Sequence, residues 1–260
     1  MTELEYALLF AAAAVGGAVN AVAGGGTFAT FPALIFVGVP PVPANATSTV
    51  ALWPGFVAAT FAYRRELQSS RRWLLPLFAI GASGGALGAL LLLYTSNARF
   101  SQLVPYLMLI AAVVFSFGAR VNGWINGLEL GPRGSRLLRV LGGLLLLIIT
   151  IYGGYFGGGM GMLLLATFAL LGMTDIHRMN ALKNALATLI NCVAVVTFIA
   201  GGVVAFRPGL VMVAAATLGG YGGAALARRV DPLWVRRFVL VVAWGMTTYF
   251  FWRAHAARGV

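Results

Sequence analysis

The residues best suited to chemistry in this sequence surround a single lysine. Lys183 is the only lysine among the 18 Lys and Arg residues, and Asn180 and Asn184 flank it within an apolar segment. An ionisable side chain inside such a segment is a candidate for function, and the natural partner of an ammonium group is an anion. Lys183 could instead extend its ammonium group to the aqueous boundary from the start of a helix, and this alternative stays open.

Two glycine clusters provide a second feature suited to binding an anion. They are Gly24, Gly25 and Gly26, followed by Thr27, and Gly157, Gly158 and Gly159 in the second half of the chain. Glycine lets a ligand approach the backbone closely, and the N–H groups at the start of a helix attract negative charge. Since one exposed helix terminus contributes only about 0.3–1 kcal/mol, further polar groups are needed.

A polar run in the first half supplies such groups. Its members are Asn45, Thr47, Ser48 and Thr49. Their amide and hydroxyl groups can donate hydrogen bonds to an anion. Hydroxyl groups in membrane helices commonly bond their own backbone or a neighbouring helix, so part of this set has a structural alternative.

Covalent chemistry has weaker support. The stretch from Gly81 to Gly84 matches the motif around the nucleophile of intramembrane serine proteases, so a protease that uses Ser83 is an alternative. The two histidines that could act as its base, His177 and His255, fall at or beyond the ends of apolar segments, whereas Ser83 lies within one. The single cysteine, Cys192, excludes an internal disulfide and a cysteine metal cluster. We therefore expect no enzyme, no cofactor and no metal site.

The composition places these residues in a membrane. Hydrophobic residues make up 60% of the sequence, charged residues 9%, and the mean hydropathy is +0.92. A water-soluble core of this size cannot hide so much apolar surface, so we expect an all-α integral membrane protein. The expected apolar spans are 4–23, 27–39, 46–63, 72–94, 100–119, 137–156, 160–173, 180–204, 209–227 and 233–252. The second and seventh spans, which close on Gly38 and Gly172, are too short to cross a hydrocarbon layer of about 30 Å.

The net charge of +12 is distributed as in a membrane protein. Arginines gather in the short connections around 64–72, 120–139 and 228–237, which the positive-inside rule assigns to the cytoplasm. Arg99 and Arg207 stand alone in their connections and then fall outside, together with both termini. We expect the lipid bilayer as a partner and no nucleic acid.

The spans divide the chain into two repeats. Gly38 and Asn45 in the first half correspond to Gly172 and Asn180 in the second. We expect repeat 1 at 1–119, a cytoplasmic linker at 120–136 and repeat 2 at 137–260. Each repeat then holds one pair of broken or short helices, re-entrant or crossing, and three transmembrane helices, so that the second repeat has inverted topology. Interrupted helices at matching positions of two such repeats mark the substrate site of many transporters.

These motifs resemble those of the TauE/SafE family of sulfite and organosulfonate exporters. The resemblance rests on Ala23 to Gly26 with Pro32, on Ala44 to Ser48 after Gly38, and on His177 to Asn184, and it covers nearly the whole chain. It implies a plasma-membrane permease for a small sulfur-containing anion such as sulfite or sulfoacetate. One departure is that Thr47-Ser48-Thr49 in the first half becomes Leu182-Lys183-Asn184 in the second, so the halves contribute different ligands.

The acidic residues bear on how export would be driven. All six fall in termini or connections in this topology: Glu3, Glu5, Glu66, Glu129, Asp175 and Asp231. No carboxylate is therefore expected at mid-membrane to carry a proton or hold Na⁺. A membrane potential supplies about 2.3 kcal/mol per charge and 100 mV, which favours uncoupled export of an anion. An anion channel of the same fold is the alternative, and a homo-oligomer is left open.

Overall fold

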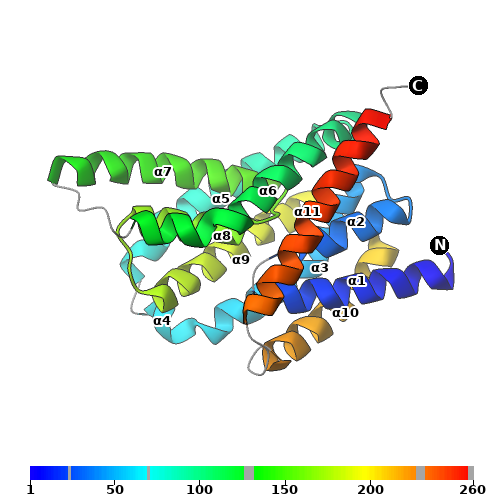
Figure 1. Ribbon diagram of the computed structural model, residues 1–260, viewed down its shortest axis with the longest axis horizontal. Helices are drawn as coiled ribbons and strands as arrows, with labels where there is room; N and C mark the ends of the chain where they lie inside the picture. Colours follow the sequence, from blue (N-terminus) through cyan, green and yellow to red (C-terminus); the bar gives the residue numbers. More distant parts are fainter. Residues whose placement is uncertain (23–24, 69–70, 126–131, 227–231, 257–260) are drawn as a thin grey trace.

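The computed structural model describes residues 1–22, 25–68, 71–125, 132–226 and 232–256, which form α-helices and short connections (Figure 1). The helices are α1 (Glu3–Val22), α2 (Thr27–Phe36), α3 (Pro41–Ala62), α4 (Arg64–Gln68), α5 (Arg71–Leu93), α6 (Asn97–Ile125), α7 (Pro132–Tyr155), α8 (Met160–Leu170), α9 (Ile176–Ala200), α10 (Phe206–Leu226) and α11 (Pro232–Ala256). Because the described residues contain no strand, the expected all-α class is confirmed.

The outer surface of the helices suits a lipid bilayer. Leu74–Leu93, Asn97–Val114 and Ile176–Ala200 are long and apolar enough to cross a membrane. Large apolar side chains also project outward, among them Leu75, Leu210 and Val241, which are at least 70% exposed. Apolar side chains at such exposure are stable against lipid and costly against water. The expected membrane location is therefore supported.

The two short helices follow the two glycine clusters. α2 has 10 residues and α8 has 11. At about 1.5 Å per residue each spans roughly 15–17 Å, which is about half the thickness of a hydrocarbon layer. The sequence prediction of two short helices, one in each half, is confirmed.

Several helices start earlier than the sequence predicted, and the starts of α3 and α9 have a clear local cause. α3 begins at Pro41 rather than at residue 46, since proline in the first turn has its φ already set for a helix. α9 begins at Ile176 rather than at residue 180, because the Asp175 carboxylate caps it by accepting from the N–H groups of His177 and Arg178 at 2.9 and 3.3 Å. Asn45 therefore lies one turn inside its helix, and Lys183 lies two turns inside.

The expected linker at 120–136 overlaps two helices. α6 continues to Ile125 and α7 begins at Pro132. Residues 126–131 between them lie outside the described part of the chain.

Glycines bring pairs of long helices into close contact. α1 packs chiefly on α10, and α7 packs chiefly on α5. A Cβ atom at Gly17 of α1 would collide with the carbonyl of Ala216 in α10, and a Cβ at Gly88 of α5 would collide with the carbonyl of Ile151 in α7. α3 and α9 lie between these pairs: α3 contacts α9 and α10, and α9 contacts α3 and α5.

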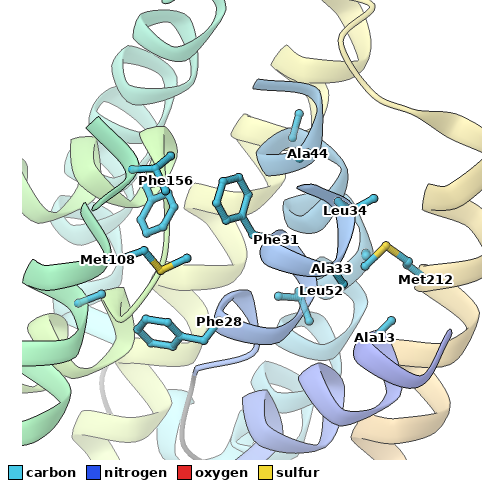
Figure 2. Packing of buried hydrophobic residues seen from close by; sticks show 14 of the residues in the cluster. Ala13, Phe28, Phe31, Ala33, Leu34, Ala44, Leu52, Met108, Phe156 and Met212 are labelled. Carbon is cyan, nitrogen blue, oxygen red and sulfur yellow. The ribbon is translucent and has the colours of Figure 1, made fainter. Parts of the chain in front are cut away.

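The short helix α2 lies in the centre of the main hydrophobic core. Phe28 and Phe31 point from one side of α2 toward Met108 and Phe156, and Leu34 lies on the side facing Met212 (Figure 2). Phe31 is fully buried. Both termini lie at the same end of the molecule as the connection from α2 to α3, at the right of Figure 1, whereas α4 and the start of α7 lie at the other end.

Candidate functional site

The break between α7 and α8 depends on glycine. Gly157 and Gly159 have φ of +78° and +74°, a region that side chains with a Cβ rarely adopt. A Cβ at Gly159 would also lie 3.1 Å from the Cβ of Ala111 in α6. The Tyr152 hydroxyl donates to the carbonyl of Gly158 at 2.6 Å and fixes the turn from within α7. The first turn of α8 is thereby held in the interior. The N–H groups of Met160 and Met162 donate to the carbonyls of Gly157 and Gly159 at 3.3 and 3.1 Å, and the positive end of the helix dipole lies at this turn.

Asn45 of α3 binds the start of this break. Its Nδ2 donates to the carbonyl of Tyr155, the last residue of α7, at 3.0 Å. The side chain is 1% exposed, and its Oδ1 is buried without a hydrogen-bond partner. A residue of the first half of the chain is thus fixed to the glycine break of the second half.

Lys183 of α9 lies at the other end of the break. Its Nζ donates to Oδ1 of Asn180 at 3.1 Å. A Cβ at Gly161 would lie 3.5 Å from Cδ of Lys183, so the aliphatic part of the lysine passes along the first turn of α8. The ammonium group and the N-terminal end of α8 are both positive, and together they favour an anion between them. Asn184, one residue further along α9, is buried.

The first glycine cluster has a different geometry. Gly26 adopts an ordinary right-handed helical conformation, with φ of −57°, and a Cβ there would lie 2.5 Å from the carbonyl oxygen of Gly16 in α1. Gly25 and Gly26 are buried, Thr27 is half-buried at the start of α2, and Gly24 lies outside the described residues. Gly26 therefore allows a close approach of α1 to the start of α2, and glycine is required at this position for space.

The hydroxyl groups of the polar run separate into different environments. Ser48 shares a buried hydrogen bond of 2.6 Å with Thr30 of α2. Thr47 accepts from the N–H of Ala205 at 2.9 Å, and Thr49 donates to the carbonyl of Asn45 in its own helix at 3.0 Å. Because Thr47 is about 200° around the helix from Asn45, it faces α10 rather than the break. Asn45 thus contacts the end of α7 before the break, and Lys183 contacts the first turn of α8 after it. Asn180 bonds to Lys183, and Thr47 lies elsewhere.

Several polar residues near the breaks were not anticipated from the sequence. Thr30 and Tyr152 bond within the interior, as described above, and Asn20 of α1 would lie 3.1 Å, measured to its Cβ, from a Cβ at Gly26. A usable signal was available for Asn20, an amide inside an apolar run less than two turns before the glycine cluster. Asn45 contacts Tyr155 through its backbone carbonyl, so the type of side chain at position 155 could not have predicted this contact.

A pocket of about 500 Å³ opens between the end of α2 and the starts of α3 and α6, beside the end of α11. Gln102, Ser101 and the exposed Arg253 line it together with apolar residues, and Phe31 and Phe250 lie on its inner side. Phe31 packs on Phe100, Phe156 and Phe250, with ring centroids 5.8–6.3 Å apart. Phe31 and Phe250 thus line the pocket, and Phe31 connects it to the buried rings of Phe100 and Phe156.

The features of an enzyme do not come together among the described residues. Ser83 is exposed on α5, and its hydroxyl donates to the carbonyls of Ala79 and Ile80 in its own helix at 2.8 and 3.1 Å. The exposed ring of His255 is bonded to the carbonyl of Phe251, and neither it nor the exposed His177 has a described hydrogen bond to Ser83. Within the described ranges there is also no cluster of three or more His, Cys, Asp or Glu that could hold a metal ion.

Comparison with known proteins gives consistent matches over nearly the whole chain. The family model described as Sulfite exporter TauE/SafE matches residues 9–250. A probable membrane transporter protein of Haemophilus influenzae is 29% identical over 93% of this chain and 92% of its own length. Probable membrane transporter protein ORF9 of Sinorhizobium is 27% identical over 94% and 92%, and probable membrane transporter protein YfcA of Escherichia coli K12 is 26% identical over 98% and 93%. No solved structure matches the chain.

Proposed function

The chain belongs to the sulfite exporter TauE/SafE family of membrane transporters, and from that membership we propose that it is a permease that exports a small sulfur-containing anion, sulfite or an organosulfonate. We choose an anion as the substrate because of the position of Lys183, whose side chain passes along the first turn of α8. The bond from Lys183 to the neutral Asn180 leaves the charge of the ammonium group unbalanced, and a negative charge at the start of α8 would interact favourably with both the ammonium group and the helix N-terminus.

The proposed binding site is the turn between α7 and α8 with the side chains at its two ends. Asn45 lies at the end of α7, and Lys183 with Asn180 and Asn184 lies at the start of α8. The first half adds the glycine cluster Gly24–Gly26 with Thr27, and the hydroxyl of Ser48. In this proposal Thr47 and Thr49 orient α3 through their bonds to Ala205 and to the backbone of Asn45.

We infer an inverted repeat from the packing of corresponding helices. The pair α1 and α10 corresponds to α7 and α5, and the contacts of α3 with α10 correspond to those of α9 with α5. α3 and α9, which correspond to each other, are bonded directly, since Nε1 of Trp53 donates to the carbonyl of Thr188 at 3.2 Å. Repeats at 1–119 and 137–260 around a cytoplasmic linker account for this pattern, and they place the site near the bilayer midplane.

The proposed outward direction of transport follows from the negative charge of the substrate and from the positions of the acidic residues. Among the described acidic residues, Glu3 and Glu5 lie in the first turn of α1, Glu66 in α4 and Asp175 at the cap of α9, away from mid-membrane. Since the described part of the chain puts no carboxylate there to couple a cation, the membrane potential of the inner membrane drives the anion outward in this proposal, at about 2.3 kcal/mol per charge and 100 mV. In this topology both termini and the pocket beside Arg253 face the outside.

The closed inner end of that pocket supports a carrier over a channel. Phe31 lines the pocket and is fully buried, and we infer that its ring and the rings packed on it close the path from the pocket to the glycine breaks. A carrier that alternates between two states requires such a closed layer in each state.

The test measures binding and then transport. Purified protein is screened for thermal stabilisation by sulfite, sulfate, thiosulfate, sulfoacetate, isethionate, acetate and chloride, because a ligand that binds only the folded state raises its apparent stability. We expect stabilisation by sulfur oxyanions, and saturable efflux with counterflow from proteoliposomes that stops when the potential is clamped to zero. Stabilisation by cations or neutral solutes alone would overturn the anion assignment, and efflux that persists unchanged at zero potential would overturn uncoupled export.

A further inference from the structure

The side-chain oxygen of Asn45 is a buried acceptor that has no donor. Asn45 is 1% exposed, its Nδ2 donates to the carbonyl of Tyr155 at 3.0 Å, and its Oδ1 is buried without a partner. Buried polar atoms in folded proteins are almost always hydrogen-bonded, and an exception calls for an explanation. Here the exception lies beside the glycine break proposed above to bind the substrate.

The orientation of the amide is fixed by its neighbour. A backbone carbonyl can only accept a hydrogen bond, so the amide group that faces Tyr155 must be the NH₂ group. Turning the amide over would set two acceptors against each other and leave two donors without a partner. The group without a partner is therefore the carbonyl oxygen of the side chain.

Oδ1 of Asn45 lies close to the path that a ligand would take from the pocket to the glycine break. Pro41 lines the pocket, and Asn45 lies four residues further along α3, on the same face and one turn deeper. Tyr155 itself precedes Phe156, which packs on Phe31 at the inner side of the pocket. A ligand that passes these rings therefore comes next to the Asn45 amide.

We propose that Asn45 selects substrates that carry a hydrogen-bond donor of their own in addition to the anionic group. The negative oxygens of the ligand bind at Lys183 and the start of α8, and an O–H or N–H group of the same ligand donates to Oδ1 of Asn45. The substrate class is thereby narrowed to hydrogensulfite and to hydroxyl- or amino-substituted alkanesulfonates. A fully deprotonated oxyanion or a plain alkanesulfonate leaves the oxygen unpaired, and an unpaired buried acceptor opposes binding.

This inference rests on the proposed function, and a matched pair of ligands separates the two. Isethionate and ethanesulfonate have the same sulfonate and the same number of carbon atoms, but only isethionate has a hydroxyl group. Their dissociation constants are measured by calorimetry with the purified, full-length protein. We expect isethionate to bind at least about tenfold more tightly, which is the usual consequence of one buried hydrogen bond left unmade.

Two variants test whether Asn45 is the residue that produces the preference for isethionate. Asn45→Leu keeps the branched shape of the side chain, removes the acceptor together with the donor to Tyr155, and is expected to bind both ligands with equal affinity. Asn191→Leu is the matched control, because Asn191 is also a buried asparagine in an apolar helix, with its Nδ2 bonded to the carbonyl of Ala187 in that helix at 2.8 Å. The control is expected to keep the preference for isethionate. Should Asn45→Leu fail to fold, Asn45→Ala tests the same loss of the acceptor with a shorter side chain.

The outcomes are distinct. Equal binding of both ligands by the unmodified protein would overturn the selection by Asn45 and leave the anion permease standing. Stabilisation by Na⁺ in the absence of any anion, lost in Asn45→Leu, would assign the oxygen to a cation and overturn the inference as well. Binding of neither sulfonate would overturn it together with the organosulfonate branch of the proposed function.

Discussion

Gly38 and Gly172 adopt almost the same left-handed backbone, with φ of +83° and +82°, each two residues after the end of a short helix. Gly38 donates to the carbonyl of Ile35 and Val39 to that of Leu34, at 3.1 and 3.0 Å. Gly172 and Met173 repeat the pattern after α8, at 2.9 and 3.0 Å. Both ends are Schellman caps, in which a residue with positive φ satisfies the last carbonyls of the helix. The two halves thus stop their short helices by the same device.

Replacing either cap glycine by alanine is expected to cost about 1–2 kcal/mol in the free energy of unfolding, because a left-handed residue with a Cβ is strained. A Cβ finds open space at both positions, so the backbone conformation is the source of the loss. Unfolding of Gly38→Ala and Gly172→Ala in detergent tests this, with Gly143→Ala, a helical position with equal space, as the control. A stabilising effect at either cap would contradict the expectation.

Gly159→Ala is expected to be more costly than either cap variant. It combines a positive φ with a Cβ only 3.1 Å from Ala111, so α6 and α8 must move apart, for a total of about 2–3 kcal/mol. Thermal unfolding measures the loss, and anion binding is expected to weaken with it because the first turn of α8 moves. Gly245→Ala provides the control, since its Cβ meets nothing within 4 Å. Equal stability of the two variants would show that the break tolerates a side chain.

The hydroxyl pair of Thr30 and Ser48 is expected to couple α2 to α3 by about 0.5–1.5 kcal/mol. A double-mutant cycle with Thr30→Val and Ser48→Ala measures this coupling energy by chemical unfolding. Thr30→Val is expected to cost more, because Thr30 keeps a bond to the carbonyl of Gly26 at 3.2 Å when Ser48 is removed. Additive losses in the double variant would mean that the two hydroxyls act independently.

Most of the helix arrangement was predictable from hydropathy and glycine. The apolar runs and the turns at Gly38 and Gly172 indicated the short helices. Hydrophobic periodicity and helix-breaking residues determine structure locally, so they can be recognised in the sequence. The starts of α3 and α9 were misplaced since Pro41 and Asp175 stand before the apolar runs, where caps and first turns are polar or proline-containing.

The proposed site was chosen from the sequence by residue type, and its role in binding stays a prediction. The structure adds the contacts of Asn45 with the end of α7 and of Lys183 with the start of α8. The helical period alone would have separated Asn45 from Thr47, which lie on opposite sides of α3. The partner of Asn45 is a backbone carbonyl distant in sequence, and such a contact is set by how the helices pack.

Replacing Lys183 by methionine is expected to weaken binding of a sulfur oxyanion by about 10- to 100-fold, the usual value of a hydrogen bond to a charged group. Methionine keeps the apolar contact along Gly161 and removes the charge. The dissociation constant measured by calorimetry checks this, and Lys183→Arg is expected to retain part of the affinity. The exposed Arg207, in Arg207→Met, controls for loss of net charge. An unchanged affinity in Lys183→Met would place the anion elsewhere and leave Lys183 with a role at the membrane boundary.

Phe31→Ala is expected to make transport leaky. Phe31 contacts the rings of Phe100, Phe156 and Phe250, so its removal opens the layer between the pocket and the interior. Deleting a buried phenylalanine also costs about 3–5 kcal/mol of stability, and Phe198→Ala, an equally buried deletion in α9 away from the pocket, controls for that loss. Efflux from proteoliposomes is expected to saturate for the unmodified protein and for Phe198→Ala, and to rise without saturation for Phe31→Ala. Because a channel needs no closed layer, non-saturating efflux by the unmodified protein would contradict the carrier, and saturation in all three would show that these rings do not close the path.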